Sequence, residues 1–320
     1  MSTKRVKELT DKLEEGLKNL KDSDEFKKYL KCMSRFHSYS YNNTLLIMMQ
    51  MPQATLIAGY GSWKKNFNRT VKKGEKGIKI LAPVPVKRTV DMQSMDENGE
   101  TYTQKQEITI PVFRPVTVFD ISQTEGEPVA ELNNGELKGS VKEYEDLKRA
   151  LFMASDVPVI MKDIEDGAKG YFDPKSKDIY IKKDMSESQT IKTMIHEMAH
   201  SILHNSADVH EKKDRNTKEV EAESVAFTVC SHFGIDTGDY SFAYILGWSR
   251  NASLDEFKRS LETIQKCSSR LIKDIQANLK EIKIERKSIR QRLSESKDKS
   301  MSDRTKKTKE KTNEFSHIQC

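Results

Sequence analysis

The chain has 320 residues, of which 36% are hydrophobic and 32% are charged, and its formal net charge is +6. This length has room for two domains of ordinary size, and the low apolar fraction indicates that part of the chain lies outside a packed core. The small net charge excludes a strongly basic or strongly acidic protein, so the local distribution of charge is the better guide.

Cysteine usage and the lengths of the apolar runs narrow the class of protein further. The four cysteines (Cys32, Cys230, Cys267 and Cys320) form no C-x-x-C pair, which excludes a disulfide scaffold and a cysteine zinc site. The N-terminal segment lacks the apolar core of a signal peptide, and no run approaches the roughly 20 apolar residues of a membrane span. We therefore expect a cytoplasmic protein without a membrane partner.

The first half of the chain begins with helical patterns and continues with strand patterns. Helices are expected at residues 4–32 and 43–51, and strands at residues 77–84 and 107–120. The second helix ends before Pro52, and its expected N-cap is Asn42 or Asn43. The polar stretch between the two strands contains Asn98-Gly99, a pair typical of a hairpin turn.

The second half carries its own helices and strands and ends in a charged tail. A helix is expected at residues 140–155, strands at 157–163 and 177–183, and a further helix around "TMIHEMAHSILH". The tail begins with apolar residues at helical spacing and decays into a basic sequence that is expected to be disordered. It either adds non-specific electrostatic affinity or serves as a solubilising appendage. The predicted division is a first domain at 1–125, a linker at 126–139, a second domain at 140–270 and a tail at 271–320.

The segment "IHEMAH" contains the first half of a possible metal site. His196 and His200 lie four residues apart on the expected helix, so their rings point the same way. Glu197 follows His196 directly, which places it beside a metal as a general base rather than on the metal as a ligand. The alternative is an amphipathic helix that happens to carry two histidines. Because a hydrolytic zinc site needs three protein ligands and one open position, a third ligand decides between them.

The segment "KEVEAESVAF" offers that third ligand. Glu219 is the expected ligand, and Glu223, one turn later on the same face, is expected to hydrogen-bond the far nitrogen of a ligand histidine. The alternative is a solvated acidic face, but carboxylates inside an otherwise apolar helix need a partner. Glu221 is a rival for the third ligand. It lies only two residues from Glu219 and from Glu223, which is less than one helical turn, so Glu219 is preferred. His204, eight residues after His196, drifts off the ligand face and is not expected to bind the metal, but a position near the cleft stays open.

Aromatic and cationic side chains alternate in residues 55–84. Because aromatic rings stack on bases and cations follow the phosphate backbone, this pattern predicts a surface for single-stranded DNA. The alternative is that the aromatics belong to the core and the lysines form a solvated face. The residues expected to contact DNA are Tyr41, Asn42, Asn43, Tyr60, Trp63, Lys64, Lys65, Arg69, Lys72, Lys73 and Lys76.

Several of these segments resemble known families. The histidine and glutamate helices resemble zincin peptidases of the ImmA/IrrE type, and "GYFDPKSKDIYI" stands where that resemblance implies an edge strand beside the cleft. Such an edge holds a peptide by strand addition. "YNNTLLIMMQMPQATLIAGYGSWKKNFNRTVKKGEKGIKILAPV" and "VFDISQTEG" resemble the N-terminal domain of ArdC-type antirestriction proteins. "TMIHEMAHSILH", "EVEAESVAF" and "DYSFAYILGW" resemble the metallopeptidase half of the same proteins, so the likeness covers about residues 10–270.

The resemblance implies an α+β fold in which a single-stranded-DNA-binding domain precedes a zincin that binds Zn²⁺. It further implies a protein of mobile elements that protects incoming DNA from host restriction enzymes, with a protein substrate for the peptidase. Two other functions remain open: a regulatory metalloprotease that cleaves a repressor, and a DNA-binding protein whose metal site is not catalytic. Tyr171, Tyr240 and Tyr244 are the candidates for a tyrosine in the cleft.

Overall fold

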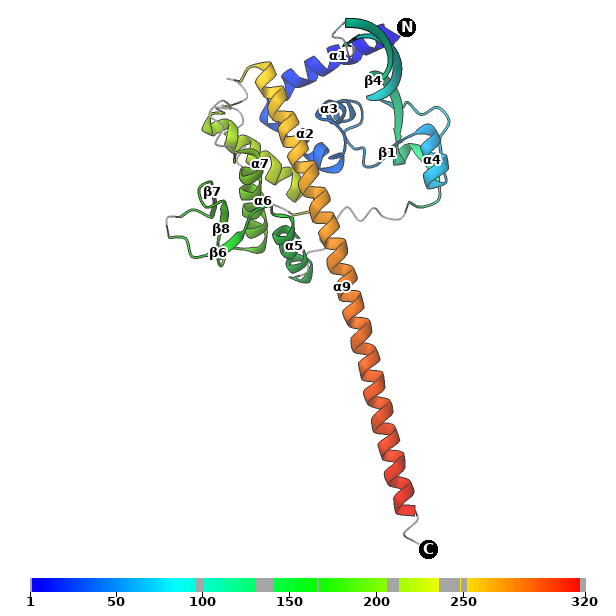
Figure 1. The fold of residues 1–320 in the computed structure, drawn as a ribbon, viewed down its shortest axis with the longest axis vertical. Helices are drawn as coiled ribbons and strands as arrows, with labels where there is room; N and C mark the ends of the chain where they lie inside the picture. The colour runs from blue at the N-terminus through cyan, green and yellow to red at the C-terminus, as the bar shows by residue number, and fades with distance from the viewer. Residues whose placement is uncertain are drawn as a thin grey trace.

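The computed structural model describes residues 2–95, 101–129, 141–165, 167–205, 213–235, 248 and 252–316. Helices and strands are mixed along the chain, which confirms the predicted α+β class (Figure 1). The elements are α1 (Ser2–Asn19), α2 (Ser23–Arg35), α3 (Tyr41–Gln50), β1 (Ile57–Gly59), α4 (Tyr60–Phe67), β2 (Arg69–Val71), β3 (Ile78–Met95), β4 (Thr101–Asp120), η1 (Ile121–Gln123), β5 (Thr124–Gly126), α5 (Val141–Ala154), β6 (Val159–Lys162), β7 (Gly170–Asp173), β8 (Asp178–Lys182), α6 (Glu187–Leu203), α7 (Arg215–His232) and α9 (Leu254–Ser316). Within the ranges described, no helix is both long enough and apolar enough to cross a membrane.

The helix predicted at residues 4–32 is divided into α1 and α2. The break falls at Asp22, whose side chain accepts hydrogen bonds from the backbone N–H groups of Asp24 and Glu25. An aspartate in this position satisfies the free N–H groups of a new helix, and it therefore starts α2 in a new direction. The leucine spacing was read correctly, but the capping residue inside the run was missed.

The N-cap of α3 is Ser40, so the prediction of Asn42 or Asn43 was wrong. The Ser40 hydroxyl oxygen accepts a hydrogen bond from the backbone N–H of Asn43. The Asn43 amide instead pairs with the backbone of Leu81, donating at 2.8 Å and accepting at 2.9 Å. Asn43 thus fastens α3 to β3 inside the first domain.

A long antiparallel hairpin of β3 and β4 dominates the first sheet, whose strand order is β1-β4-β3. Its register runs from Ile78 opposite Val118 to Met95 opposite Thr101, so the hairpin extends well beyond the two strands predicted. Asn98-Gly99 lies outside the described residues. β2 and β5 form a separate two-stranded antiparallel sheet. In the sequence, β2 precedes β3 and β5 follows β4.

The second sheet has the order β6-β8-β7, with β6 parallel and β7 antiparallel to β8. β7 is therefore an edge strand, and α6 packs against both β7 and β8. Gly170 makes this packing close, because a Cβ atom there would lie 2.7 Å from Cγ2 of Thr193 and 2.9 Å from the carbonyl oxygen of Tyr180. The glycine lets β7 approach the helix that carries the histidines.

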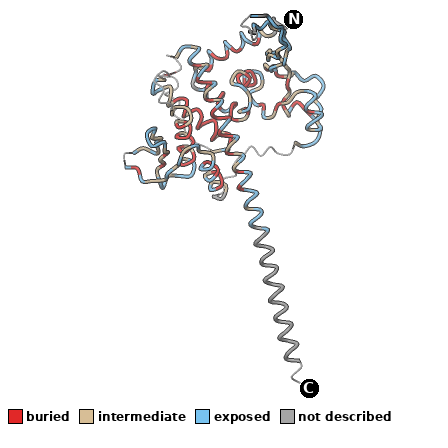
Figure 2. Tube along the Cα trace, in the orientation of Figure 1, coloured by how far each residue is buried: buried red, intermediate tan, exposed pale blue. Residues whose placement is uncertain are grey.

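The apolar core is continuous from Leu9 in α1 to Ile282 in α9. Buried residues gather where α2, α6, α7 and the upper part of α9 meet (Figure 2). Leu271 and Ile275 have no exposed surface. The predicted limit of the second domain at residue 270 therefore cuts through the core. The apolar spacing of this segment predicts a helix, but the high charge of the surrounding residues is typical of a tail.

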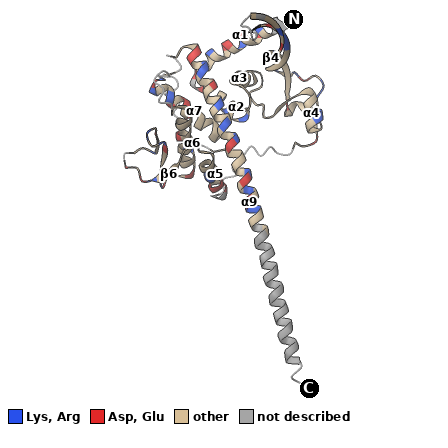
Figure 3. Cartoon of the chain, in the orientation of Figure 1, with Lys and Arg blue, Asp and Glu red and all other residues tan. Residues whose placement is uncertain are grey.

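α9 continues as one helix to Ser316 and leaves the body of the molecule (Figure 1). The backbone is thus helical as far as Ser316, in a stretch where the sequence indicated a change from helix to disorder. Lysines, arginines and acidic residues alternate along the part of α9 that lies on the body (Figure 3). Two of these charges bind α5, where Arg286 pairs with Asp146, and Glu285 pairs with Arg149.

Candidate metal centre

α6 brings the two histidines of the "IHEMAH" segment together. Ser186 caps the helix by accepting from the backbone N–H of Gln189, and the helix then runs without a break to Leu203. The Nε2 atoms of His196 and His200 lie 3.1 Å apart, as the four-residue spacing requires. Both rings are mostly buried, with side chains 19% and 17% exposed. They present two nitrogen atoms to one point in space.

α7 supplies a carboxylate at the same point. Asp214 caps this helix by accepting from the backbone N–H of Thr217. Oε2 of Glu219 lies 3.6 Å from Nε2 of His196 and 3.6 Å from Nε2 of His200. Ligand atoms about 2.05 Å from a tetrahedral zinc ion are about 3.3 Å from one another. The three distances therefore suit a divalent metal ion held by two imidazoles and a carboxylate, and the three side chains form a metal-type cluster.

The charges of the cluster are mutually dependent. Burial lowers the pKa of His196, but the neighbouring carboxylates of Glu219 and Glu223 outweigh it and raise this pKa to about 9. The bonds from His196 and His200 hold the pKa of Glu219 well below its ordinary value. A buried carboxylate facing two imidazoles is a site that favours a cation, which is either a proton on His196 or a metal ion.

Glu197 lies beside the cluster and is not part of it. Its side chain is buried at 7% exposure, and burial raises the pKa of its carboxyl group against the opposing effect of His196 and His200. A backbone hydrogen bond from Phe172 on β7 also holds this carboxylate. A carboxylate with a raised pKa next to a metal position suits a general base that must later release its proton.

Glu223 contacts the far side of the His196 ring. Oε2 of Glu223 lies 3.1 Å from Nδ1 of His196, and Oε1 lies 2.9 Å from Nζ of Lys192 on α6. A carboxylate on Nδ1 keeps a proton on that nitrogen and leaves Nε2 free to bind a metal. Glu223 thus lies next to the far nitrogen of His196 as an ion-pair partner, and a hydrogen bond between them stays a prediction.

A cleft of about 540 Å³ opens beside the cluster. Its walls include the edge strand β7, through Tyr171 and Phe172, and the start of α7, through Arg215 and Lys218. Nζ of Lys162 lies 2.7 Å from the Tyr171 hydroxyl, so this phenol stands next to a cation. Tyr171 is therefore the cleft tyrosine among the described residues, whereas Tyr240 and Tyr244 lie outside them.

Glu221 and His204 are not members of the cluster of three ligands, but His204 contacts one of them. Glu221 has no exposed surface and binds His204, with Oε2 at 3.1 Å from its Nε2. Nδ1 of His204 in turn lies 3.0 Å from Nδ1 of His200. His204 thus lies at the cleft without being a ligand, and the sequence did not predict its contact with His200. The signal was available, because His204 follows His200 by four residues on the same helix.

The residues expected to bind DNA divide into buried and exposed groups. Trp63 has no exposed surface, and its Nε1 donates to the carbonyl oxygen of Phe119. Asn43 is also buried, and Arg69 donates to the backbone of Thr124. In this structure Trp63 and Asn43 are enclosed in the first domain, whereas Arg69 is partly exposed and uses its guanidinium group on the backbone of β5. Tyr41 and Asn42 are half-buried.

The remaining candidates face the solvent. Tyr60 is 63% exposed at the start of α4, one turn before Lys64. Lys72 is exposed but donates to the carbonyl oxygen of Ser122. The exposed candidates are Tyr60, Lys64, Lys65, Lys72, Lys73 and Lys76.

Comparison with known protein families matches both halves of this architecture. Residues 2–119 match the N-terminal domain of anti-restriction factor ArdC, and residues 153–264 match the IrrE N-terminal-like domain of the M78 peptidases. The fold and the ligand cluster thus define a protein with a metallopeptidase-like domain of the IrrE type. The chain thus combines an N-terminal domain of the ArdC type with an IrrE-like domain of the M78 peptidases.

Individual relatives are more distant. The chain is 26% identical over 321 residues to the uncharacterized protein pXO2-81 of Bacillus anthracis, and the alignment covers 89% of this chain and 54% of that protein. The chain therefore spans about half the length of that curated relative. The Mn(II)-bound crystal structure of antirestriction protein ArdC from the R388 plasmid has a TM-score of 0.53 at 19% identity, covering 83% of this chain and 97% of that one. The metal-free structure of the same protein has a TM-score of 0.48 at 21% identity, covering 75% and 85%.

Proposed function

We propose that this chain is an antirestriction protein whose first domain holds single-stranded DNA and whose second domain is a zinc peptidase. The observation that carries the proposal is the convergence of His196, His200 and Glu219 next to the buried carboxylate of Glu197. Two histidines and a glutamate are a usual ligand set for catalytic zinc. A matching N-terminal domain of the ArdC type connects this site with DNA.

The residues of the cleft suit hydrolysis of a peptide. Zinc held by the three ligands would polarise a scissile carbonyl and make a water molecule more acidic. Glu197 accepts the proton of the attacking water and later delivers it to the leaving amine. Its raised pKa suits the first step, because a more basic carboxylate takes a proton from the water more readily. Glu223 keeps His196 in the orientation and tautomer that a metal ligand needs.

The edge of β7 suits an extended substrate. β7 pairs with β8 on one side only, and Gly170, Tyr171 and Phe172 line the cleft. A peptide that adds to this edge lies along the cleft and passes Glu197. Main-chain hydrogen bonds would then supply affinity, and the cleft walls would select side chains.

The exposed side chains of the first domain suit contact with single-stranded DNA. Tyr60 offers a ring for stacking, and Lys64 and Lys65 follow it on α4. Lys73 and Lys76, in the connection between β2 and β3, add positive charge. A ring with several nearby lysines binds single strands with little sequence preference.

Metal content and DNA protection test the two halves of the proposal. Zinc should copurify with the wild type and be lost in His196→Ala and Glu219→Ala, as measured by elemental analysis, with Mn²⁺ titrated in parallel. Full metal retention in both variants would end the assignment. Glu197→Gln should keep the metal and lose the protection of transferred DNA from restriction.

Two other results would support the two alternative functions, a DNA-binding protein without catalysis and a regulatory protease. Protection that survives Glu197→Gln would indicate a DNA-binding protein whose metal site is not catalytic. A cellular repressor that is cut only in the presence of wild-type Glu197 would indicate a regulatory protease.

A further inference from the structure

The far nitrogen of His200 is held by a second histidine rather than by a carboxylate. Nδ1 of His200 lies 3.0 Å from Nδ1 of His204, and Nε2 of His204 lies 3.1 Å from Oε2 of Glu221. The side chain of His204 is 6% exposed and that of Glu221 is fully buried. His196, by contrast, has a direct carboxylate partner in Glu223. The two ligand histidines are thus supported in different ways.

When His200 is a metal ligand, the protons on the hydrogen-bonded series His200, His204 and Glu221 have one consistent arrangement. Nε2 of His200 must then offer its lone pair to the metal, so Nδ1 carries the proton and donates to Nδ1 of His204. His204 therefore carries its proton on Nε2 and donates to Glu221. In this arrangement every donor in the series faces an acceptor. The hydrogen-bonded series therefore favours the tautomer of His200 that binds a metal.

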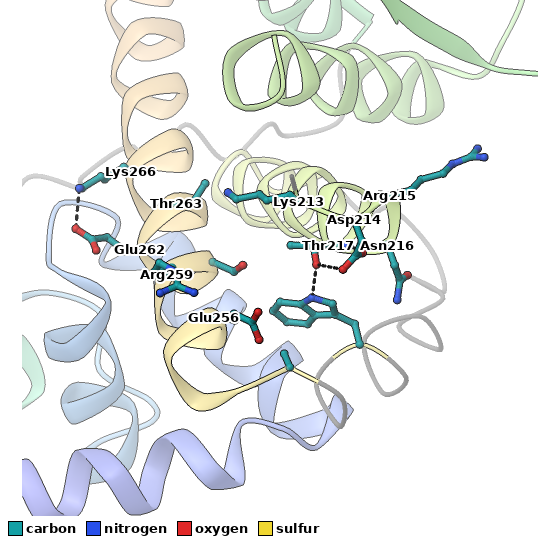
Figure 4. Close-up of a pocket in the computed structure, with 13 residues that line it drawn as sticks. Lys213, Asp214, Arg215, Asn216, Thr217, Glu256, Arg259, Glu262, Thr263 and Lys266 are labelled. Carbon is teal, nitrogen blue, oxygen red and sulfur yellow. Dashed lines mark hydrogen bonds and ion pairs between the residues drawn. The ribbon is translucent and has the colours of Figure 1, made fainter. Parts of the chain in front are cut away.

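The Glu221 carboxylate, at the end of the hydrogen-bonded series, is held by two further groups that do not belong to α6. Ser260, on α9, donates from its hydroxyl to Oε1 of Glu221 at 2.6 Å. Nζ of Lys213 lies 3.1 Å and 3.0 Å from the two oxygen atoms of Glu221. A buried carboxylate needs such partners to stay ionised and in place. Lys213 and Ser260 also line a cavity of about 930 Å³ between the start of α7 and the first turns of α9 (Figure 4).

α9 is fixed to the rest of the molecule on several sides. Gln265 donates to the carbonyl oxygen of His37 after α2, and Asn278 donates to the carbonyl oxygen of Ala150 in α5. Ser260 itself is only 3% exposed. Its hydroxyl group is therefore held at a fixed place by a helix that both halves of the chain contact.

We propose that His204 and Glu221 are positioning residues for the metal ligand His200, and that Ser260 anchors them from α9. The affinity of the site for metal then depends on the packing of α9, which lies outside the two helices that supply the ligands. The inference rests on the metal centre of the proposed function and goes beyond it, because it assigns a metal-related role to a helix with no ligand.

Metal affinity of the full chain tests the inference. Zn²⁺ titration should show a loss of roughly 10–100-fold in His204→Ala, the usual effect of removing an outer partner of a ligand. His204→Gln should restore most of the affinity, because its amide accepts from His200 through oxygen and donates to Glu221 through nitrogen. Ser260→Ala should lose affinity several-fold and Ser260→Thr should regain it. Ser268→Ala is the matched control, since Ser268 is also buried on α9 but its hydroxyl group has no hydrogen-bond partner within the described chain.

The tautomer of His200 supplies a readout that a merely structural role would not change. In the zinc-loaded wild type, long-range ¹H–¹⁵N correlation should show a proton on Nδ1 of His200 that exchanges slowly with water. The same proton should exchange faster in His204→Ala while circular dichroism remains that of a folded protein. Equal zinc affinity in the wild type, His204→Ala and Ser260→Ala would overturn the positioning role alone. A wild type that binds no divalent metal would overturn the metal centre and this inference together.

Discussion

The Nδ1 atom of His196 lies 3.1 Å from Oε2 of Glu223, on the side of the ring that faces away from Glu219. Under the proposed function we expect this ion pair to orient the imidazole for a metal. It also gives a partner to the glutamate that stands one turn after Glu219 on α7.

The first prediction concerns this contact. Glu223→Ala should weaken divalent metal binding by roughly 10–100-fold, because His196 loses the partner that fixes its tautomer. Glu223→Gln should lose less, since the amide oxygen still accepts from Nδ1 of His196. Isothermal titration with Zn²⁺ measures both, and Glu187→Ala at the exposed start of α6 is the control. Unchanged affinity in Glu223→Ala would show that the contact is incidental.

The second prediction concerns stability. A metal that binds only the folded chain stabilises it by about 2.7 kcal/mol when its free concentration is 100-fold above the dissociation constant. Zinc should therefore raise the melting temperature of the wild type, and a chelator should reverse the change. Glu219→Ala should melt at the same temperature with and without zinc. A zinc-dependent shift of wild-type size in that variant would remove Glu219 from the ligand set.

The third prediction separates two aromatic residues of the first domain. Tyr60→Ala should weaken binding to single-stranded DNA by about 1–3 kcal/mol without a change in stability, because an exposed ring that stacks on a base is lost. Trp63→Ala should instead destabilise the fold by about 3–5 kcal/mol, because a large side chain with no exposed surface is removed. Fluorescence anisotropy and chemical denaturation measure the two effects. Equal DNA affinity in Tyr60→Ala and wild type would exclude this ring from the DNA surface.

The fourth prediction concerns the salt dependence of DNA binding. Lys73 and Lys76 are exposed, and no contact of their amino groups is seen among the described residues. If each neutralises one phosphate, replacing both by glutamine should reduce the slope of log affinity against log salt by about 0.7 for each lysine. Lys87→Gln on β3 is the control, because Lys87 already pairs with Glu107. A slope unchanged by the double replacement would place the DNA elsewhere.

The sequence predicts the position of a side chain best when that position depends only on spacing within one helix. The spacing of His196 and His200 and the face shared by Glu219 and Glu223 follow from helical geometry, and the structure brings these four residues together. Trp63 was assigned to a DNA surface because its neighbours are cationic, although its burial depends on β4, which follows much later in the chain. The contact of Ser260 with Glu221 joins residues 39 positions apart, and no local pattern indicates it.

The C-terminal helix gives the fifth prediction. Leu271, Ile272 and Ile275 have no exposed surface, and Arg286 pairs with the buried Asp146 of α5. A chain that ends after residue 270 should therefore fail to fold, because it loses these apolar contacts and leaves Asp146 without its cation. A chain that ends after residue 291 should keep the melting temperature and metal affinity of the full chain, since it retains every α9 residue of the core. Far-ultraviolet circular dichroism and thermal melting compare the two. A stable, metal-binding chain ending at residue 270 would restore the domain limit that the sequence predicted and would show that the shared core is dispensable.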